Sequence, residues 1–213
     1  MVLCPNWGDR YLRRIANASA PVKDTSVTHV RLCCLLFFLM ASATWADESL
    51  DLVNYRTYSP TLSSSGQPSA KQLAAVADAG FERVVYLALT DQDSSLEHED
   101  RIVRELGMGF AQIPVIWERP TAEDFELFAA VMRQGADKRT LVHCQINWRA
   151  SSFVFLYRTI YGGVPMSDAK LDLDQVWTPQ PHWKDFIFEV LASHNLSPDC
   201  ELCDWDKPHA MNH

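Results

Sequence analysis

The sequence lacks several features that would place it in a specialised class of protein. It has no internal repeat and no low-complexity tract beyond Ser63–Gly66. With 47% hydrophobic and 22% charged residues, its composition argues against disorder, a collagen-like repeat and a disulfide-dense miniprotein. Basic residues are also scarce, because 19 Lys and Arg stand against 27 Asp and Glu, a formal charge of −8. Such a field repels polyanions, so we expect no nucleic-acid partner.

A hydrophobic run long enough to span a bilayer is also missing. The apolar run of residues 32–43 follows Arg31 and is shorter than the roughly 20 apolar residues that a spanning helix needs. Small residues ending at Ala46 come next, and this order is typical of a cleaved secretory signal peptide. We therefore interpret residues 1–46 as a leader and predict export, to the periplasm. An uncleaved leader would be the only membrane contact; a buried helix is the alternative interpretation of the run.

Few cysteines remain once the leader is set aside. Cys144, Cys200 and Cys203 are an odd number of thiols. In an oxidising compartment Cys200 and Cys203 are close enough in sequence to form a disulfide, which leaves Cys144 free. Free thiols, or a metal site with His209 and His213, are the alternatives, but this terminal segment lacks the long spacer of zinc sites. We therefore expect neither a metal nor another cofactor.

The remaining chain divides into a domain, residues 47–199, and a tail, residues 200–213. Segments with strand character alternate with segments of helical periodicity, which predicts one three-layer α/β domain with a mainly parallel sheet flanked by helices. The predicted strands are short extended pieces within 55–65, and then the segments 83–89, 110–115 and 140–143. Two of the predicted helices begin at capping boxes, one at Ser69 and one at Thr121. The other three cover 95–106, the segment from Arg149 to Ile160, and 181–194.

One strand-to-helix connection carries the chemistry. Cys144 directly follows the strand 140–143, and Arg149 lies at the start of the next helix. Backbone N–H groups and the helix dipole make such a connection an anion cradle. A cysteine there is favoured as a thiolate nucleophile, and an arginine offers a planar pair of donors to phosphate. The alternative is a buried structural cysteine beside a surface arginine.

The segment His143–Ser151 resembles the signature loop of the cysteine-dependent protein tyrosine and dual-specificity phosphatases, in the variant found in the bacterial beta-lactamase-hydrolase-like phosphatase family. The similarity extends over about residues 55–195 and includes Ser65–Pro68 and Ile113–Trp117. It implies a phosphatase-like fold and hydrolysis of a phosphomonoester, on a small molecule or a phosphoprotein, through a cysteinyl-phosphate on Cys144. The implied phosphate-binding residues are Gln145, Ile146, Asn147, Trp148 and Arg149.

The resemblance also implies supporting roles for residues near the loop. The family places a general acid after the strand 110–115, where Glu118 is the first carboxylate. Asp124 is a second candidate, although its place in a capping box is already a sufficient role. His143 would orient the loop, unless it is a satisfied core histidine. Ser151 would assist departure of the thiolate, cap the helix, or do both.

The loop departs from the phosphatase pattern in its length. Four residues separate Cys144 from Arg149, where the phosphatases have five, and Ala150 occupies the place expected for the arginine. One position at the start of a helix turns a side chain by about 100°. The arginine would then be misaligned, unless the shorter loop re-forms around a smaller anion. Rhodanese-type sulfurtransferases have four such residues in a loop that holds a persulfide. A sulfurtransferase carrying a persulfide on Cys144 and a catalytically weak, phosphate-binding pseudophosphatase therefore stand as alternatives.

Overall fold

Five short strands form the central sheet of residues 50–206, the part of the chain that the computed structural model describes. The sheet order is β1-β2-β5-β3-β4, and only the pair β1 and β2 is antiparallel. The strands are β1 (Arg56–Ser59), β2 (Leu62–Ser65), β3 (Arg83–Tyr86), β4 (Gly109–Gln112) and β5 (Thr140–His143). The predicted extended pieces within 55–65 correspond to β1 and β2.

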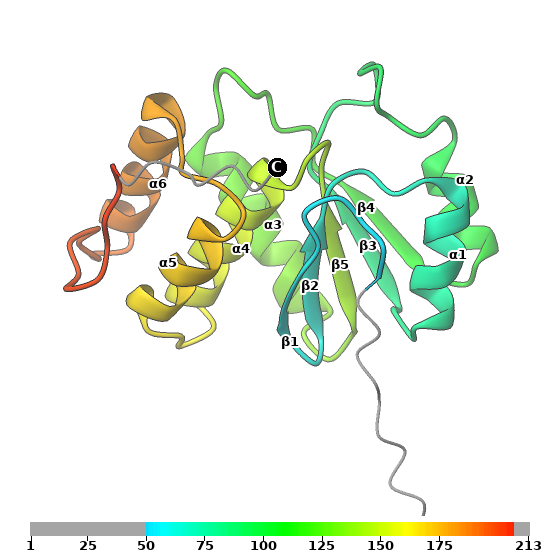
Figure 1. Cartoon of the computed structure of the whole chain (residues 1–213), viewed down its shortest axis with the longest axis horizontal. Coiled ribbons are helices and arrows are strands. Elements are labelled where there is room, and N and C mark those ends of the chain that lie inside the picture. The colour runs from blue at the N-terminus through cyan, green and yellow to red at the C-terminus, as the bar shows by residue number, and fades with distance from the viewer. Residues whose placement is uncertain (1–49, 207–213) are drawn as a thin grey trace, which may run out of the picture. The chain divides into compact units, whose positions relative to one another are not determined.

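Helices cover both faces of this sheet (Figure 1). One face carries α1 (Ala70–Asp78) and α2 (Glu99–Glu105). The other carries α3 (Ala122–Gln134), α4 (Trp148–Ile160), α5 (Met166–Asp174) and α6 (Pro181–Ser193). This arrangement confirms the predicted three-layer α/β domain with a mainly parallel sheet.

Side chains of the central strands alternate between two hydrophobic cores. On β5, Leu141 packs in the core that contains Leu73 of α1, whereas Val142 packs in the core that contains Phe153 of α4. Successive residues of a strand point to opposite faces, so a buried strand needs apolar side chains on both. The continuous apolar runs in the sequence therefore mark β3 and β5, the middle strands that carry the loops of the site.

Three predicted elements differ from the structure in their ends. The strand predicted over 110–115 ends at Gln112, shortly before Pro114, which has no N–H for a ladder. The strand predicted over 83–89 ends at Tyr86. The helix predicted from Ser95 begins only at Glu99, because the Ser95 hydroxyl contacts the Tyr86 hydroxyl and the Leu89 carbonyl within a loop.

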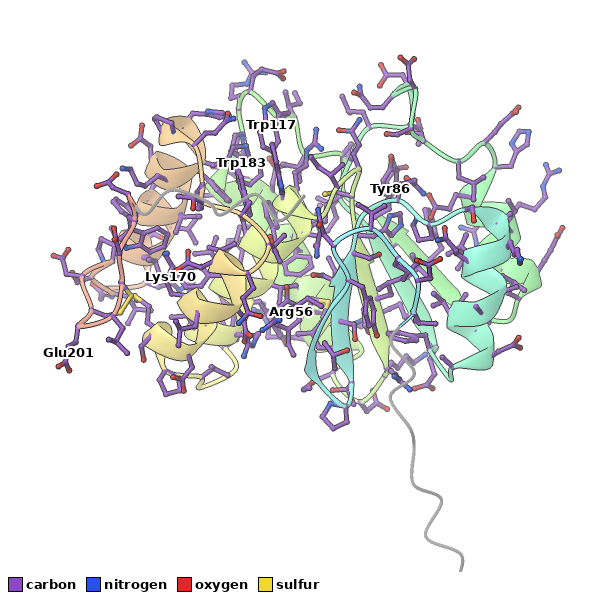
Figure 2. All side chains as sticks on the ribbon, viewed as in Figure 1. Arg56, Tyr86, Trp117, Lys170, Trp183 and Glu201 are labelled. Carbon is purple, nitrogen blue, oxygen red and sulfur yellow. A yellow bond between two sulfur atoms is a disulfide. The ribbon has the colours of Figure 1, made fainter. Side chains whose placement is uncertain are left out.

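Helix α5 was not predicted, because its sequence shows no continuous apolar face. Its buried residues are Ala169, Lys170 and Leu173. Lys170 points into the interior (Figure 2), where its ammonium group pairs with Asp174 and lies 4.7 Å from the centre of the Trp205 ring. A buried charged residue at a core position removes the pattern by which a helix is recognised.

The segment after α6 returns over α4 to α6. Cys200 and Cys203 form a disulfide, as one of the sequence alternatives predicted. Trp205 packs edge-on against Phe155 and Phe188. The leader with Ala46, and the histidines at 209 and 213, lie outside the described residues. Within residues 50–206, no helix has the length and apolar character required to cross a membrane.

Candidate active site

Cys144 lies at the end of β5, where the chain turns into α4. Cys144 is 1% exposed, and its backbone N–H donates a hydrogen bond of 3.3 Å to the Ser65 carbonyl. The carbonyl of the preceding residue, His143, accepts from the Leu87 N–H at 2.9 Å. The nucleophile candidate therefore follows a backbone that is fixed by strands on both sides.

The loop after Cys144 is held by the segments that precede and follow the β1–β2 hairpin. The Gln145 carbonyl accepts from the Gln67 N–H at 2.9 Å, and the Ile146 carbonyl accepts from the Asn54 side chain at 2.9 Å. Gly66 permits this approach, because a Cβ there would lie 2.8 Å from the Gln145 carbonyl oxygen.

A pocket of about 300 Å³ opens at this loop. It brings together the strand end that carries Cys144, the first turn of α4, and the loop after β4 that carries Glu118. Its lining is Gln92, Trp117, Glu118, Cys144, Gln145, Ile146, Trp148, Arg149 and Gln180. The predicted nucleophile, arginine and general acid thus face one cavity.

Arg149 remains in the pocket although the loop is one residue short. The residue is 4% exposed, and its Nη1 donates to Oε1 of Gln145 at 3.1 Å. Its Cζ lies 5.3 Å from the centre of the Trp117 ring. The Nε is buried without a hydrogen-bond partner within residues 50–206. The shorter loop therefore re-forms around the arginine and does not turn it away.

Glu118 is exposed and belongs to a loop that α6 anchors. The carbonyl of the neighbouring Trp117 accepts from Nε1 of Trp183 at 3.1 Å, and Nε2 of His182 lies 3.2 Å from it. The Trp117 and Trp183 rings lie 5.1 Å apart (Figure 2). The loop that carries the acid candidate is thus fixed one residue before Glu118.

Three of the other predicted residues are buried close to the loop without lining the pocket. The Asn147 side chain donates to the Asn54 carbonyl, away from the cavity. The Ser151 hydroxyl donates to the Trp148 carbonyl at 3.2 Å and does not cap the helix, which begins at Trp148. His143 is fully buried at the base of the loop.

Asp124, the second acid candidate, is engaged elsewhere. It forms the predicted capping box with Thr121 at the start of α3, in which each side chain bonds the backbone of the other. It does not line the pocket. Of the two carboxylates, only Glu118 faces Cys144 across the cavity.

Sequence reasoning missed three glutamate and glutamine residues of this region. Gln92 and Gln180 line the pocket, and Oε1 of Gln92 accepts from Nε2 of Gln145 at 3.2 Å. Glu99 reaches His143 from the first turn of α2. A usable signal existed for Gln92, because loops that follow neighbouring parallel strands meet at one edge of the sheet. No local pattern marks Gln180 or Glu99.

Comparisons with known proteins agree with a phosphatase-like fold. Residues 46–180 match the family described as DSP-PTPase phosphatase fused to NAD+ kinase. A candidate phosphatase (DUF442) from Shewanella putrefaciens CN-32 is 32% identical, with a TM-score of 0.62 over 68% of this chain and 95% of that one. Tk-PTP in its active form shares the fold at 16% identity, with a TM-score of 0.56 over 64% of this chain and 95% of that one.

A more distant structure is similar over a comparable share of the chain. The catalytic domain of SIW14, a PP-IP phosphatase from S. cerevisiae, is 10% identical, with a TM-score of 0.53 over 67% of this chain and 93% of that one. At such identity only the fold is shared. A search of curated proteins found no significant match.

Proposed function

Because the chain belongs to the family of DSP-PTPase phosphatases fused to NAD+ kinase, we propose that it is a cysteine-dependent phosphatase acting on phosphomonoesters through a cysteinyl-phosphate. The observation that carries this proposal is the joint placement of Cys144, Arg149 and Glu118 around one pocket. These residue types supply a nucleophile, a phosphate-binding cation and a proton donor.

Phosphate binding follows from the start of α4. The first N–H groups of any helix lack intrahelical acceptors, and the N-cap residue Asn147 makes no capping hydrogen bond from its side chain. These donors and the positive end of the helix dipole are therefore left for an anion. Arg149 adds charged donors that stabilise the equatorial oxygens of the phosphoryl group as it transfers.

The reaction proceeds in two displacements. The Cys144 thiolate attacks phosphorus, the bond from phosphorus to the ester oxygen breaks, and Glu118 gives its proton to the leaving oxygen. Water then attacks the cysteinyl-phosphate while the Glu118 carboxylate accepts a proton from it. The S–P bond breaks, the thiolate is restored, and inorganic phosphate leaves.

The charges of the pocket favour a substrate with one phosphate group. Among its lining residues, Arg149 is the single basic side chain. A substrate with several phosphates would bring further negative charge to a site with no second cation. Trp117 and Trp148 instead offer aromatic surface for an uncharged body of the substrate.

Trapping of the intermediate tests the proposal directly. Native protein and a Cys144→Ser variant are mixed separately with an aryl phosphate and with thiosulfate, quenched in acid, and measured as intact masses. We expect an adduct about 80 Da heavier from the phosphate, only with Cys144 present. An adduct about 32 Da heavier from thiosulfate would identify a sulfurtransferase, and no adduct from either would identify a binding protein.

We also propose that the phosphatase acts after export. The disulfide between Cys200 and Cys203 supports this, because structural disulfides persist in oxidising compartments and are rare in the cytosol. Fractionation of producing cells should place the processed chain in the periplasm. Recovery of the intact chain in the cytosol with both thiols free would contradict export.

A further inference from the structure

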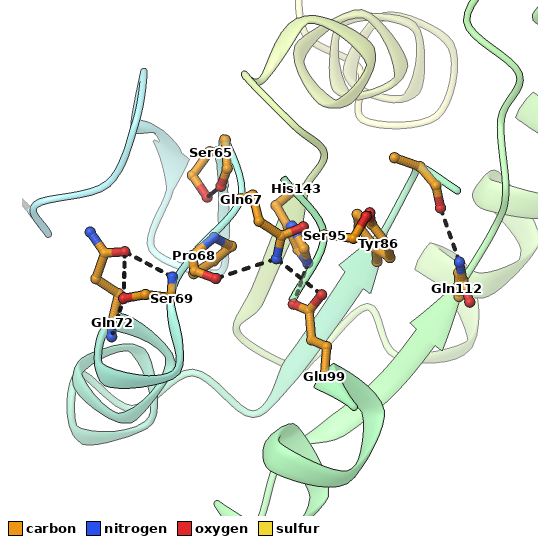
Figure 3. Close-up of polar contacts among 12 residues, drawn as sticks. Ser65, Gln67, Pro68, Ser69, Gln72, Tyr86, Ser95, Glu99, Gln112 and His143 are labelled. Atoms are coloured by element: carbon orange, nitrogen blue, oxygen red, sulfur yellow. Dashed lines mark hydrogen bonds and ion pairs between the residues drawn. The ribbon is translucent and has the colours of Figure 1, made fainter. Parts of the chain in front are cut away.

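A buried carboxylate lies at the base of the candidate loop, and the mechanism above leaves it without a role. Glu99 opens α2 and is 5% exposed. Its Oε1 lies 2.9 Å from Nε2 of His143, whose side chain is fully buried (Figure 3). Its Oε2 accepts from Nε2 of Gln67 at 3.0 Å. Three segments far apart in the sequence thus meet directly behind Cys144.

The position of Glu99 is built into the backbone. His98, the residue before it, has a φ of 58°, a left-handed conformation that few non-glycine residues adopt. This turn places the side chain of the next residue in the interior. His98 itself points outward, where it pairs with exposed Glu97. Glu99, in contrast, lies in the interior against His143.

The imidazole of His143 has few other contacts that could support it. Its ring stacks on Tyr86 at 4.7 Å with an interplanar angle of 14°. Within residues 50–206, both ring nitrogens and Oε1 of Glu99 are buried without a hydrogen-bond partner, so the contact between Glu99 and His143 is an ion pair and not a hydrogen bond. Glu99 is the acidic group in contact with the ring. A buried carboxylate needs a compensating charge or donors, and a positive ring beside it supplies one.

Tyr86 shows which charged groups act on this region. Burial is the largest cause and raises the pKa of its hydroxyl, whereas the hydrogen bond with Ser95 lowers this pKa. The charges of Glu99 and Cys144 raise the pKa further, and the charge of Arg149 lowers it. Glu99, Cys144 and Arg149 are thus close enough to interact through one shared neighbour.

We propose that Glu99 is a positioning residue for the proposed phosphatase reaction, on which this inference rests. Through its ion pair it holds a positive imidazole of His143 at the base of the loop, next to Cys144. A neighbouring cation favours the thiolate of a cysteine over the thiol. When the carboxylate is absent, a charge on this buried ring has no counter-charge.

The test combines Glu99→Gln, His143→Gln and the double variant of the full chain. Glu99→Gln keeps the shape of the side chain. Oε1 of Gln67 is buried without a hydrogen-bond partner, so rotation of the Gln67 amide lets this oxygen accept from the new amide group. The readout is alkylation of Cys144 by iodoacetamide, followed by peptide mass spectrometry between about pH 5 and pH 9. It requires no phosphatase turnover, so it stays informative even where that activity is lacking.

We expect each single variant to lower the alkylation rate of Cys144 about 10-fold at neutral pH, moving its pH profile upward by about one unit. The double variant should lose about the same factor, since Glu99 acts through His143. The KM for an aryl phosphate should change less than about threefold, because Arg149 and the helix amides remain. Glu126→Gln, which removes the exposed pairing of Glu126 with His194, is the matched control and should leave the profile unchanged.

Two outcomes would overturn this assignment. A native alkylation profile in Glu99→Gln would make the pair purely structural. Losses that multiply to about 100-fold in the double variant would mean that Glu99 acts without His143. Should Glu99→Gln fail to fold, Glu99→Asp takes its place, because the shorter side chain withdraws the carboxylate from Nε2 of His143. A native profile in Glu99→Asp would then overturn the assignment, and a lowered one would support it.

Discussion

The side-chain amide of Asn147 donates a 2.6 Å hydrogen bond to the backbone carbonyl of Asn54, which lies 93 positions earlier in the chain. Asn147 has a φ of 73° and is the N-cap residue of α4. Asparagine adopts the left-handed conformation more readily than most residues, and here its side chain also ties the loop to the segment before β1. One residue thus sets both the turn and the anchor of the candidate loop.

The two roles of Asn147 can be separated by substitution. Asn147→Ala should lower the free energy of unfolding by about 2 kcal/mol, because it loses a hydrogen bond and keeps an unfavourable φ. Asn147→Gly should lose only about 1 kcal/mol, since glycine accepts this φ. Urea denaturation measures both, and equal losses would mean that the φ of 73° carries no cost.

Acid should weaken an ion cluster that joins β1 to α4 and α5. Asp172 contacts Arg56 at 2.6 Å and Arg158 at 2.7 Å. Burial alone would raise the pKa of Asp172, but hydrogen bonds from the two arginines outweigh it, and the pKa falls below its ordinary value. A lowered pKa in the folded state stabilises the fold above the unfolded pKa of about 4, and this stabilisation is lost as the pH falls.

Asp172→Asn should therefore lower the free energy of unfolding by about 1–2 kcal/mol at pH 7, a value reduced for partial exposure of the cluster. Native protein and variant should converge below about pH 4. Asp100→Asn, which removes an exposed pair with Arg104, is the control and should cost at most about 0.5 kcal/mol. A gap that persists into acid would show that the carboxylate charge is not its source.

Trp148 should contribute to the choice of substrate. It lines the pocket while its ring stacks on buried Trp177 at 4.9 Å and 4°. Trp148→Ala should raise the KM for an aryl phosphate about 3- to 10-fold, which corresponds to the loss of one aromatic contact. The KM for glycerol phosphate should rise less, because this substrate has no ring. Trp148→Phe should restore most of the difference. Equal effects on both substrates would indicate that the ring only supports the loop.

The sequence predicts those parts of the fold that depend on near neighbours. The capping boxes of Ser69 with Gln72 and of Thr121 with Asp124 span three residues each, and both form. The order of strand, Cys144, loop and helix could also be predicted, because these parts form one continuous segment. These features identify the layers, the loop and its family.

Contacts between distant segments explain what the sequence could not show. Glu99 meets Gln67 across 32 positions, and no periodicity or spacing records such a meeting. The same holds for Arg149: counting residues left open whether the short loop would misalign it or re-form, and contacts with Gln145 and Trp117 retain it in the pocket. Position in a loop follows from packing, which residue spacing does not specify.

The role of Glu118 as a general acid can be tested by comparing two leaving groups. A general acid contributes more to the rate when the leaving group needs a proton more. Glu118→Gln keeps the shape of the side chain and removes the proton. We expect about a 100-fold loss of kcat for an alkyl phosphate, a poor leaving group, and less than about a 10-fold loss for an aryl phosphate with an acidic phenol.

Stopped assays with both substrates measure this ratio, and Glu123→Gln at the exposed start of α3 is the matched control. The anchored Trp117 carbonyl keeps the loop in place in either variant, so a change in the ratio reports proton transfer and not a displaced loop. An equal loss with both substrates would remove Glu118 from the proton-transfer step. Since Asp124 is held in its capping box, water in the pocket would then be the next candidate for the proton donor.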